Sequence, residues 1–305
     1  MRRIPGALVV AVALTVSAGC GAVGSGGSGP QVVASFYPLA YVAERVAGDH
    51  IEVDNLTSPG VEPHDLEMTP QQVADLSEAD LVVYEQGFQP AVDEAVDQNS
   101  PDLILDVTEV VELGDPGAER TASEDERDYV ELEGDPHVWL DPTLLIPVAH
   151  EVASELAEID PDHAADFRAN ANRLVSDLER LDSDFTDGLS QCERSTFVTS
   201  HAAFGYLAHR YGLEMVPIAG LSPDAEPSPQ QLSQISDLIE AEGITTVFSE
   251  TLGSQEYADT LANDLGVQTA VLDPIEGLTD EDSSDDYLSL MRENLTALRE
   301  ANGCA

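Results

Sequence analysis

The chain contains no lysine: its twelve basic residues are all arginine, against 59 aspartates and glutamates, for a formal net charge of −47. A surface this negative repels polyanions, which excludes binding to nucleic acid or to anionic membrane surfaces as a function. Two interpretations of the acidity remain open. Acidic surfaces without lysine suit a protein that stays soluble in high salt, where repulsion is screened within about 3 Å at 1 M. A negative field also concentrates cations.

Long apolar runs are missing as well, and the one near the N-terminus, Ile4–Val16, is too short to span a bilayer comfortably. With two arginines before it and small residues after it, this run predicts an export signal over residues 1–19. Cys20 and the Gly/Ser-rich linker over residues 20–30 resemble a bacterial lipoprotein processing site, with Cys20 as the acylated residue. Because Ser17 stands where such sites usually carry Leu, plain secretion remains the alternative.

Cysteine is scarce, with two residues beyond Cys20 and no CxxC pair. In an exported chain, the even pair Cys192 and Cys304 predicts a disulfide. Closing so long a loop restricts the unfolded chain by about 4 to 5 kcal/mol in the entropic model. The alternative, two thiolates on a metal, is not favoured because neither cysteine lies near a candidate ligand.

What the sequence does have is enough apolar content, 42% of 305 residues, for two ordinary cores. Apolar, β-rich runs alternate with helical stretches in both halves, which predicts βαβ units and mostly parallel sheets. The expected strands are 32–36, 51–56, 80–84 and 103–105 in the first half, and 195–199, 214–218, 245–249 and 268–272 in the second.

A long helical stretch lies between the two halves. Its apolar positions recur at three or four residues, as in Phe167, Leu174 and Leu181, and no Gly or Pro interrupts residues 162–181. The predicted fold is therefore α/β, with two small lobes joined by one long rigid helix. The expected boundaries place the N-terminal lobe at 31–160, the connecting helix at 161–190 and the C-terminal lobe at 191–305.

Four short loops, far apart along the chain, each carry one metal-capable side chain: His64, His137, His201 and Asp273. Ligands so widely spaced converge only if each ends a different structural unit at a shared cleft. In α/β sheets that cleft lies at the carboxyl ends of the strands. Three imidazoles and a carboxylate suit a divalent ion such as zinc, so we expect a metal site between the lobes.

The motifs around these residues resemble the metal-specific solute-binding proteins of ABC transporters, the zinc and manganese uptake lipoproteins. The resemblance covers nearly the whole mature chain and rests on the strings Glu-Pro-His-Asp at 62–65, Asp-Pro-His-Val-Trp-Leu-Asp-Pro at 135–142, Ser-His-Ala-Ala-Phe-Gly-Tyr at 200–206 and Leu-Asp-Pro at 272–274. It implies that His64, His137, His201 and Asp273 are the ligands, in a cleft between two α/β lobes about a rigid helix. It also implies capture of the ion outside the cytoplasm, by a monomer anchored through its lipid, and delivery to an ABC permease.

The choice of metal follows from the same resemblance. A histidine at the third ligand position, here His201, goes with Zn²⁺ in this family, whereas glutamate commonly goes with Mn²⁺. Many zinc members also have a histidine-rich loop before the second ligand. The corresponding segment, 112–134, is acidic and contains no histidine. Zinc is the expected ion, with manganese or iron as alternatives, and 112–134 is interpreted as a mobile surface loop.

Two glutamates are candidates for a supporting role. Glu62 and Glu250 are each placed to orient a ligand imidazole through its second nitrogen, or to act as an alternate ligand. Either glutamate is equally suited to capping a helix.

The leading function is binding without catalysis, and affinity is expected to fall as pH drops through ~6.5 because histidine ligands must be deprotonated. A zinc hydrolase is the rival class, but the chain has no His-Glu-x-x-His helix, and a fourth protein ligand would fill the position that water needs. An exported zinc chaperone or a surface adhesin is a third possibility.

Overall fold

The computed structural model describes residues 29–99, 101–114, 134–280 and 283–305. The expected signal peptide, Cys20 and most of the linker and of the acidic segment 112–134 lie outside these residues. Within them, no helix combines the length and apolar character needed to cross a membrane.

The N-terminal lobe contains a four-stranded parallel sheet of strand order β2-β1-β3-β4. Its strands are β1 (Val32–Ala34), β2 (Val53–Asn55), β3 (Leu81–Tyr84) and β4 (Ile104–Asp106). Its helices are α1 (Tyr37–Ala47), α2 (Pro70–Glu78), α3 (Pro90–Asn99), α4 (Val107–Val110) and α5 (Leu145–Ile159), with short 3-10 turns η1 (Pro63–Asp65) and η2 (Val138–Leu140). α2 begins at Pro70, and Thr69 just before it forms a capping box with Gln72.

The C-terminal lobe repeats this arrangement with strand order β6-β5-β7-β8, again fully parallel. Its strands are β5 (Thr196–Thr199), β6 (Glu214–Pro217), β7 (Thr246–Ser249) and β8 (Gln268–Val271), and its helices are α7 (Gly205–Tyr211), α8 (Pro229–Glu242), α9 (Glu256–Leu265) and α10 (Tyr287–Asn302). The expected parallel sheets are confirmed, each strand within two residues of its predicted bounds.

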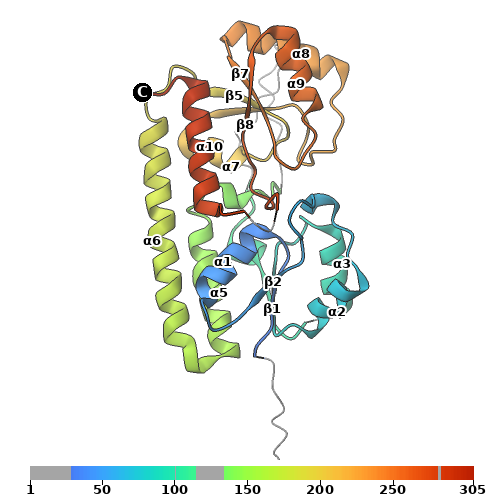
Figure 1. Ribbon diagram of the computed structural model, residues 1–305, viewed down its shortest axis with the longest axis vertical. Helices are drawn as coiled ribbons and strands as arrows, with labels where there is room; N and C mark the ends of the chain where they lie inside the picture. The colour runs from blue at the N-terminus through green and yellow to red at the C-terminus, as the bar shows by residue number, and fades with distance from the viewer. Residues whose placement is uncertain (1–28, 100, 115–133, 281–282) are drawn as a thin grey trace, which may run out of the picture.

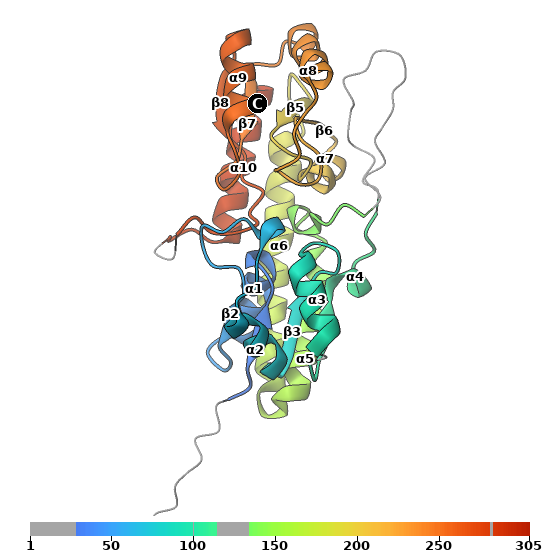
Figure 2. The ribbon, with the colours of Figure 1, turned by 90° about the vertical axis from the view of Figure 1, so that its right-hand side faces the viewer.

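One helix, α6 (Ala164–Leu189), runs along the side of both lobes after a single 3-10 turn, η3 (Pro161–His163) (Figures 1 and 2). Its buried stripe includes Phe167, Leu174 and Leu181. A single hydrophobic core joins these residues to β1 and α1 of the first lobe and to α10 of the second, so the helix is rigidly packed against both. α10, which the sequence analysis does not assign, lies beside α6.

The predicted disulfide is confirmed: Cys192 and Cys304 are bonded. The bond joins the loop after α6 to the end of α10. It therefore closes the C-terminal lobe on the connecting helix.

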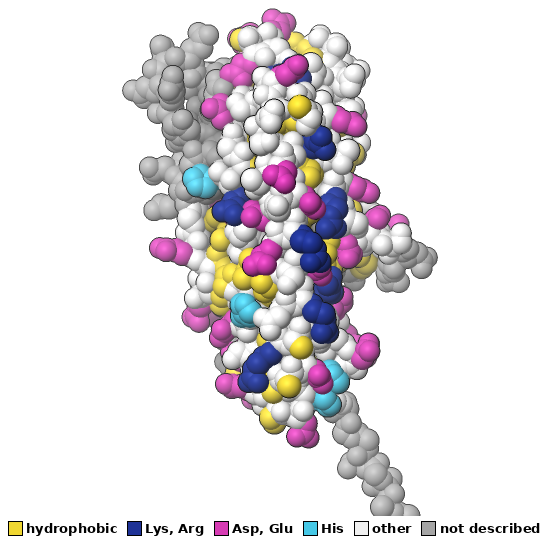
Figure 3. Space-filling view, turned by 90° about the vertical axis from the view of Figure 1, so that its left-hand side faces the viewer, with side chains coloured by type: hydrophobic (Ala, Val, Ile, Leu, Met, Phe, Trp, Pro, Cys, Tyr) yellow, Lys and Arg dark blue, Asp and Glu magenta, His cyan; other side chains and the backbone are white. Residues whose placement is uncertain are grey.

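Charge is distributed unevenly over this frame. The arginines of the described residues belong to α1, α6, α7, α10 and the loop before β5: Arg45, Arg168, Arg173, Arg180, Arg194, Arg210, Arg292 and Arg299. Figure 3, which views the α6 side, shows basic side chains in a stripe along the molecule. Residues 46–114 and 211–291, which form most of the two lobes, contain no basic residue other than histidine.

Candidate metal centre

The C-terminal lobe brings two buried side chains to the carboxyl edge of its sheet. His201 lies two residues after β5 and is fully buried. Glu276 lies in the loop that follows β8, with a side chain 1% exposed. Since β5 and β8 flank β7 in a parallel sheet, their following loops meet at one edge.

The N-terminal lobe contributes two histidines from loops opposite that edge. His64 lies in η1, between β2 and α2, with its ring edge-on to Phe88 and its side chain 11% exposed. His137 lies just before η2 and is fully buried. Of the four side chains, His64 is therefore nearest to solvent.

The four side chains converge on one point. Glu276 Oε1 lies 3.5 Å from His64 Nε2, 3.3 Å from His137 Nε2 and 3.2 Å from His201 Nε2. The Nε2 atoms of His137 and His201 are 3.4 Å apart. A tetrahedral zinc ion with bonds of about 2.0–2.1 Å separates its ligand atoms by about 3.3–3.4 Å. Among the described residues this is the one group able to hold a metal ion, and its spacing fits zinc.

Two carboxylates hold the buried imidazoles from behind. Asp135 Oδ1 lies 2.7 Å from His137 Nδ1 and also accepts from the backbone N of His137 at 3.0 Å. Glu250 Oε1 contacts His201 in the same way, 2.7 Å from Nδ1 and 3.0 Å from N. Each carboxylate fixes the ring so that Nε2 faces the centre, the usual arrangement behind metal-bound histidine.

The electrostatics of the cluster favour a cation. Burial alone would lower the pKa of His201, but Glu250 and Glu276 raise it to about 10. For His137, the neighbouring carboxylates of Asp135 and Glu276 likewise outweigh burial and raise the pKa. Burial would raise the pKa of Glu276, yet the three histidines hold it well below its usual range. The cluster therefore stabilises positive charge at its centre.

The structure does not place Asp273, the expected fourth ligand, in this cluster. Its Oδ1 accepts a hydrogen bond from the backbone N of Ile275 at 2.7 Å, and its Oδ2 accepts one from the Thr251 hydroxyl at 2.9 Å. Both oxygens are thus used within the C-terminal lobe. Glu276, three residues further on, occupies the position that the sequence analysis gave to Asp273.

The two supporting glutamates differ in place. Glu250 lies behind His201, as described, and does not cap a helix. Glu62 does cap one: it precedes η1, and its Oε1 accepts from the backbone N of His64 at 3.3 Å. Burial and the neighbouring carboxylate of Glu276 raise the pKa of Glu62 to about 8. Glu62 is therefore both a cap and a close neighbour of the cluster.

Glu276 and Asp135 were not among the predicted site residues. The signal for Asp135 was its place in the Asp-Pro-His string, two residues before a candidate ligand. The signal for Glu276 was a second acidic side chain in the loop that follows β8. The remaining histidines lie elsewhere: His50 and His163 stack on each other at 4.0 Å, and His150 and His209 are exposed on helices.

The protein has two α/β lobes with parallel sheets, packed on one long helix, and a centre of three histidines and one carboxylate lies between the lobes. These features define a metal-binding protein of the two-lobed solute-binding class. The family model described as "Zinc-uptake complex component A periplasmic" matches residues 32–301. The chain belongs to this family.

Individual relatives agree. The chain is 37% identical over 280 residues to zinc-binding lipoprotein AdcA of Streptococcus pneumoniae. The match covers 88% of this chain but 55% of that protein, so the chain spans about half the length of this relative. It is 32% identical over 319 residues to high-affinity zinc uptake system protein ZnuA of Bacillus subtilis, covering 98% of each. The Zn(II)-bound ZnuA-like domain of S. pneumoniae AdcA superposes with a TM-score of 0.73 at 35% identity, covering 90% of this chain and 99% of that one.

Proposed function

We propose that this chain is an extracytoplasmic zinc-binding protein that captures Zn²⁺ between its lobes and delivers it to an ABC permease. The observation that carries the proposal is the 3.2–3.5 Å spacing of three imidazole nitrogens around one carboxylate oxygen. On this proposal the ligands are His64, His137, His201 and Glu276, with Glu276 replacing Asp273 in the expected set.

Zinc is favoured over manganese by the donor atoms. Three of the four are imidazole nitrogens, which suit zinc, whereas manganese prefers carboxylate, carbonyl and water oxygens. The named relatives support the same ion, since AdcA is called zinc-binding and ZnuA a zinc uptake protein.

Capture without catalysis is favoured by the filled coordination. Catalytic zinc sites keep a position open for water, whereas four protein ligands complete a tetrahedron. Three of the four side chains are almost completely buried, so a substrate has no access to the ion from their side.

The experiment that tests this function is competition binding on the chelator-stripped mature chain, offered zinc and manganese together. One tightly bound zinc per chain, lost in Glu276→Ala and retained in Asp273→Asn, supports both the ion and the revised ligand set. Preference for manganese would contradict the choice of ion. Loss of zinc in Asp273→Asn with retention in Glu276→Ala would restore the original assignment.

Delivery to a permease and attachment through Cys20 are further parts of the proposal. They are supported by the family, described as a component of a zinc-uptake complex, and by AdcA, called a lipoprotein. We expect light scattering to show a monomer. We also expect the chain to incorporate labelled fatty acid, and Cys20→Ala to abolish this incorporation. Zinc-loaded chain is expected to stimulate the ATPase activity of the reconstituted transporter; equal stimulation by His201→Ala would contradict delivery.

A further inference from the structure

We propose that Asn294 is a positioning residue for the metal site. Asn294 holds the carboxylate of Glu276 in place through the turn that begins at Asp273. The inference rests on the proposed zinc site. It assigns a share in metal affinity to an α10 side chain that contacts none of the four proposed ligands, His64, His137, His201 and Glu276.

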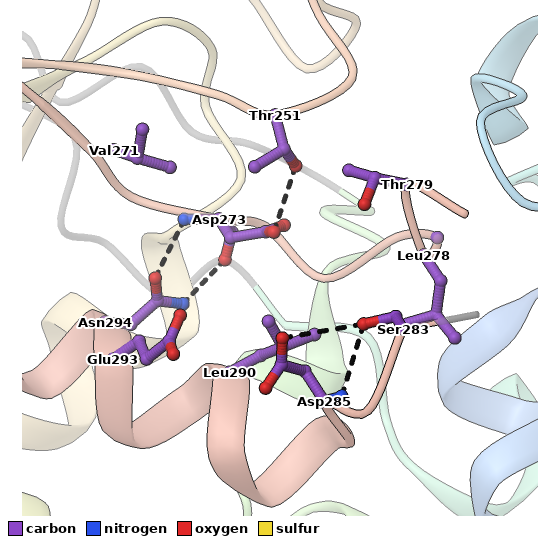
Figure 4. A pocket seen from close by; sticks show the side chains of 11 residues that line it. Thr251, Val271, Asp273, Leu278, Thr279, Ser283, Asp285, Leu290, Glu293 and Asn294 are labelled. Carbon is purple, nitrogen blue, oxygen red and sulfur yellow. Dashed lines mark hydrogen bonds between the residues drawn. The ribbon is translucent and has the colours of Figure 1, made fainter. Parts of the chain in front are cut away.

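The first observation is the way Asn294 contacts Asp273. Asn294 is 2% exposed, and its Oδ1 accepts from the backbone N of Asp273 at 2.8 Å while its Nδ2 donates to the backbone O of Asp273 at 2.6 Å (Figure 4). The preceding residue, Leu272, makes the last strand-like hydrogen bond, to Ser249 O at 3.0 Å. One side-chain amide therefore replaces the neighbouring strand at the point where β8 has ended.

The second observation is that the next residues of the turn are also held by side chains. The carboxylate of Asp273 accepts from Ile275 N and from the Thr251 hydroxyl. The indole N of Trp139 donates to Pro274 O at 2.7 Å. Each of the three residues before Glu276 thus has a backbone atom that is hydrogen-bonded to a side chain.

The third observation is strain at Ile275. Its φ is +57°, the one positive value outside glycine among the described residues, and its side chain is fully buried. A β-branched residue in the left-handed region is strained and persists only where the surroundings impose this conformation. The contacts of Asp273 impose it here, because Asp273 binds Ile275 N directly while Asn294 fixes the backbone of Asp273.

The turn also has room to relax. A cavity of about 230 Å³ lies against it, lined in part by Thr251, Asp273, Leu278 and Asn294 (Figure 4). Without the amide of Asn294, a return of Ile275 to negative φ would move the backbone that carries Glu276. Because the carboxylate lies 3.2–3.5 Å from three imidazole nitrogens, a small displacement would spoil the tetrahedral spacing.

The experiment compares Asn294→Ala with Asn170→Ala. Asn170, on α6, is a matched control. It is also buried, at 8% exposed, and its Nδ2 donates to the backbone O of Val46 at 2.8 Å. Asn294→Ala is expected to weaken zinc binding by about tenfold, the lower end of the effect of losing an outer partner of a metal ligand, because Asn294 acts on Glu276 through the turn. Asn170→Ala is expected to lower thermal stability comparably and leave zinc affinity within twofold of wild type.

A milder variant covers the case in which Asn294→Ala does not fold. Thr251→Val removes one hydrogen bond to Asp273 at an exposed loop position; it should weaken zinc binding less than Asn294→Ala but more than Asn170→Ala. In the Co²⁺-loaded chain, both turn variants should lower the intensity of the visible d–d bands, which reports loss of tetrahedral geometry.

The outcomes separate the two proposals. If wild type binds zinc tightly and His201→Ala does not, the site stands. If the turn variants then have the same zinc affinity and cobalt spectra as Asn170→Ala, the role of Asn294 is overturned but the proposed function is not. If wild type binds no zinc, the proposed function fails, and this inference fails with it.

Discussion

The N-terminal lobe and the C-terminal lobe have the same strand order, β2-β1-β3-β4 in one and β6-β5-β7-β8 in the other, and each supplies two side chains to the candidate metal centre. They differ in how firmly they hold them. The C-terminal pair, His201 and Glu276, is buried and follows strands closely, with Glu250 behind one and the Asp273 turn before the other. In the N-terminal lobe His137 is equally buried and fixed by Asp135, but His64 is partly exposed on a 3-10 turn.

The difference indicates a division of roles within the site. On the proposed ligand set, three side chains stand preorganised in the protein interior, and His64 would complete the coordination from the solvent side. Preorganised groups lose little conformational freedom on binding, which raises affinity. The ligand near solvent is the one whose loss water can partly replace.

The sharpest test of this comparison is His201→Ala. Structural zinc sites contribute roughly 10–16 kcal/mol over four ligands, or about 2.5–4 kcal/mol each. Removal of a buried ligand, at the upper end of this range, should weaken zinc binding by about a thousandfold. Competition against a chelator of known affinity measures the loss. A loss under tenfold would mean that His201 is not a ligand.

His64→Ala should have a smaller effect, about a hundredfold, because its ring is near solvent and a water molecule is able to take the vacant position. The same competition assay compares the two variants. Equal losses in His64→Ala and His201→Ala would remove the distinction between the three preorganised side chains and His64.

Acidification should weaken zinc binding. The pKa of His201 in the metal-free site is about 10, so its ring carries a proton at neutral pH that zinc must displace. Each displaced proton makes the apparent affinity fall about tenfold per unit decrease in pH. Calorimetry in two buffers of different ionisation enthalpy counts the protons released. Release of none at pH 7 would contradict the raised pKa.

Glu250→Gln tests the support behind His201. The amide oxygen is still able to accept from Nδ1, but the negative charge is lost, and we expect zinc affinity to fall about tenfold and fewer protons to be released. Asp135→Asn is the equivalent change in the N-terminal lobe. Glu226→Gln, at an exposed loop position, is the control and should match wild type.

The smallest effect on zinc is expected from Cys192→Ser with Cys304→Ser. The disulfide joins the loop after α6 to the end of α10, away from the metal centre. Its removal should lower the free energy of unfolding by about 2–5 kcal/mol, measured by denaturant titration of the metal-free chain. Zinc affinity should remain within twofold of wild type; a larger change would show that this bond also organises the Glu276 turn.

Much of this fold could be predicted because its signals are local. Alternating apolar runs predicted the parallel sheets, and an uninterrupted apolar stripe predicted α6. The three histidines that lie together in the structure could be selected from the sequence because they lie in short loops with proline or small residues, at strand ends or helix starts.

Glu276, the proposed fourth ligand, could not be found in this way. Between Asp273 and Glu276 the turn includes a positive φ at Ile275, which its β-branched side chain disfavours. Trp139 and Asn294 hold the turn in that shape, and both are distant in sequence. Such a conformation is set by tertiary contacts, and sequence periodicity carries no record of it.

The placement of the arginines has a consequence for how the protein meets its ion. Among the described residues, the arginines lie on α1, α6, α7, α10 and one loop, and the rest of the two lobes carries almost only negative charge, so the described part of the molecule is an electric dipole from its α6 side to the opposite side. A dipole turns to face an approaching cation, presenting the lobes and turning the α6 side away. At low ionic strength this orientation favours encounters on the side where the lobes meet; at molar salt, where charges are screened within about 3 Å, arrival becomes isotropic.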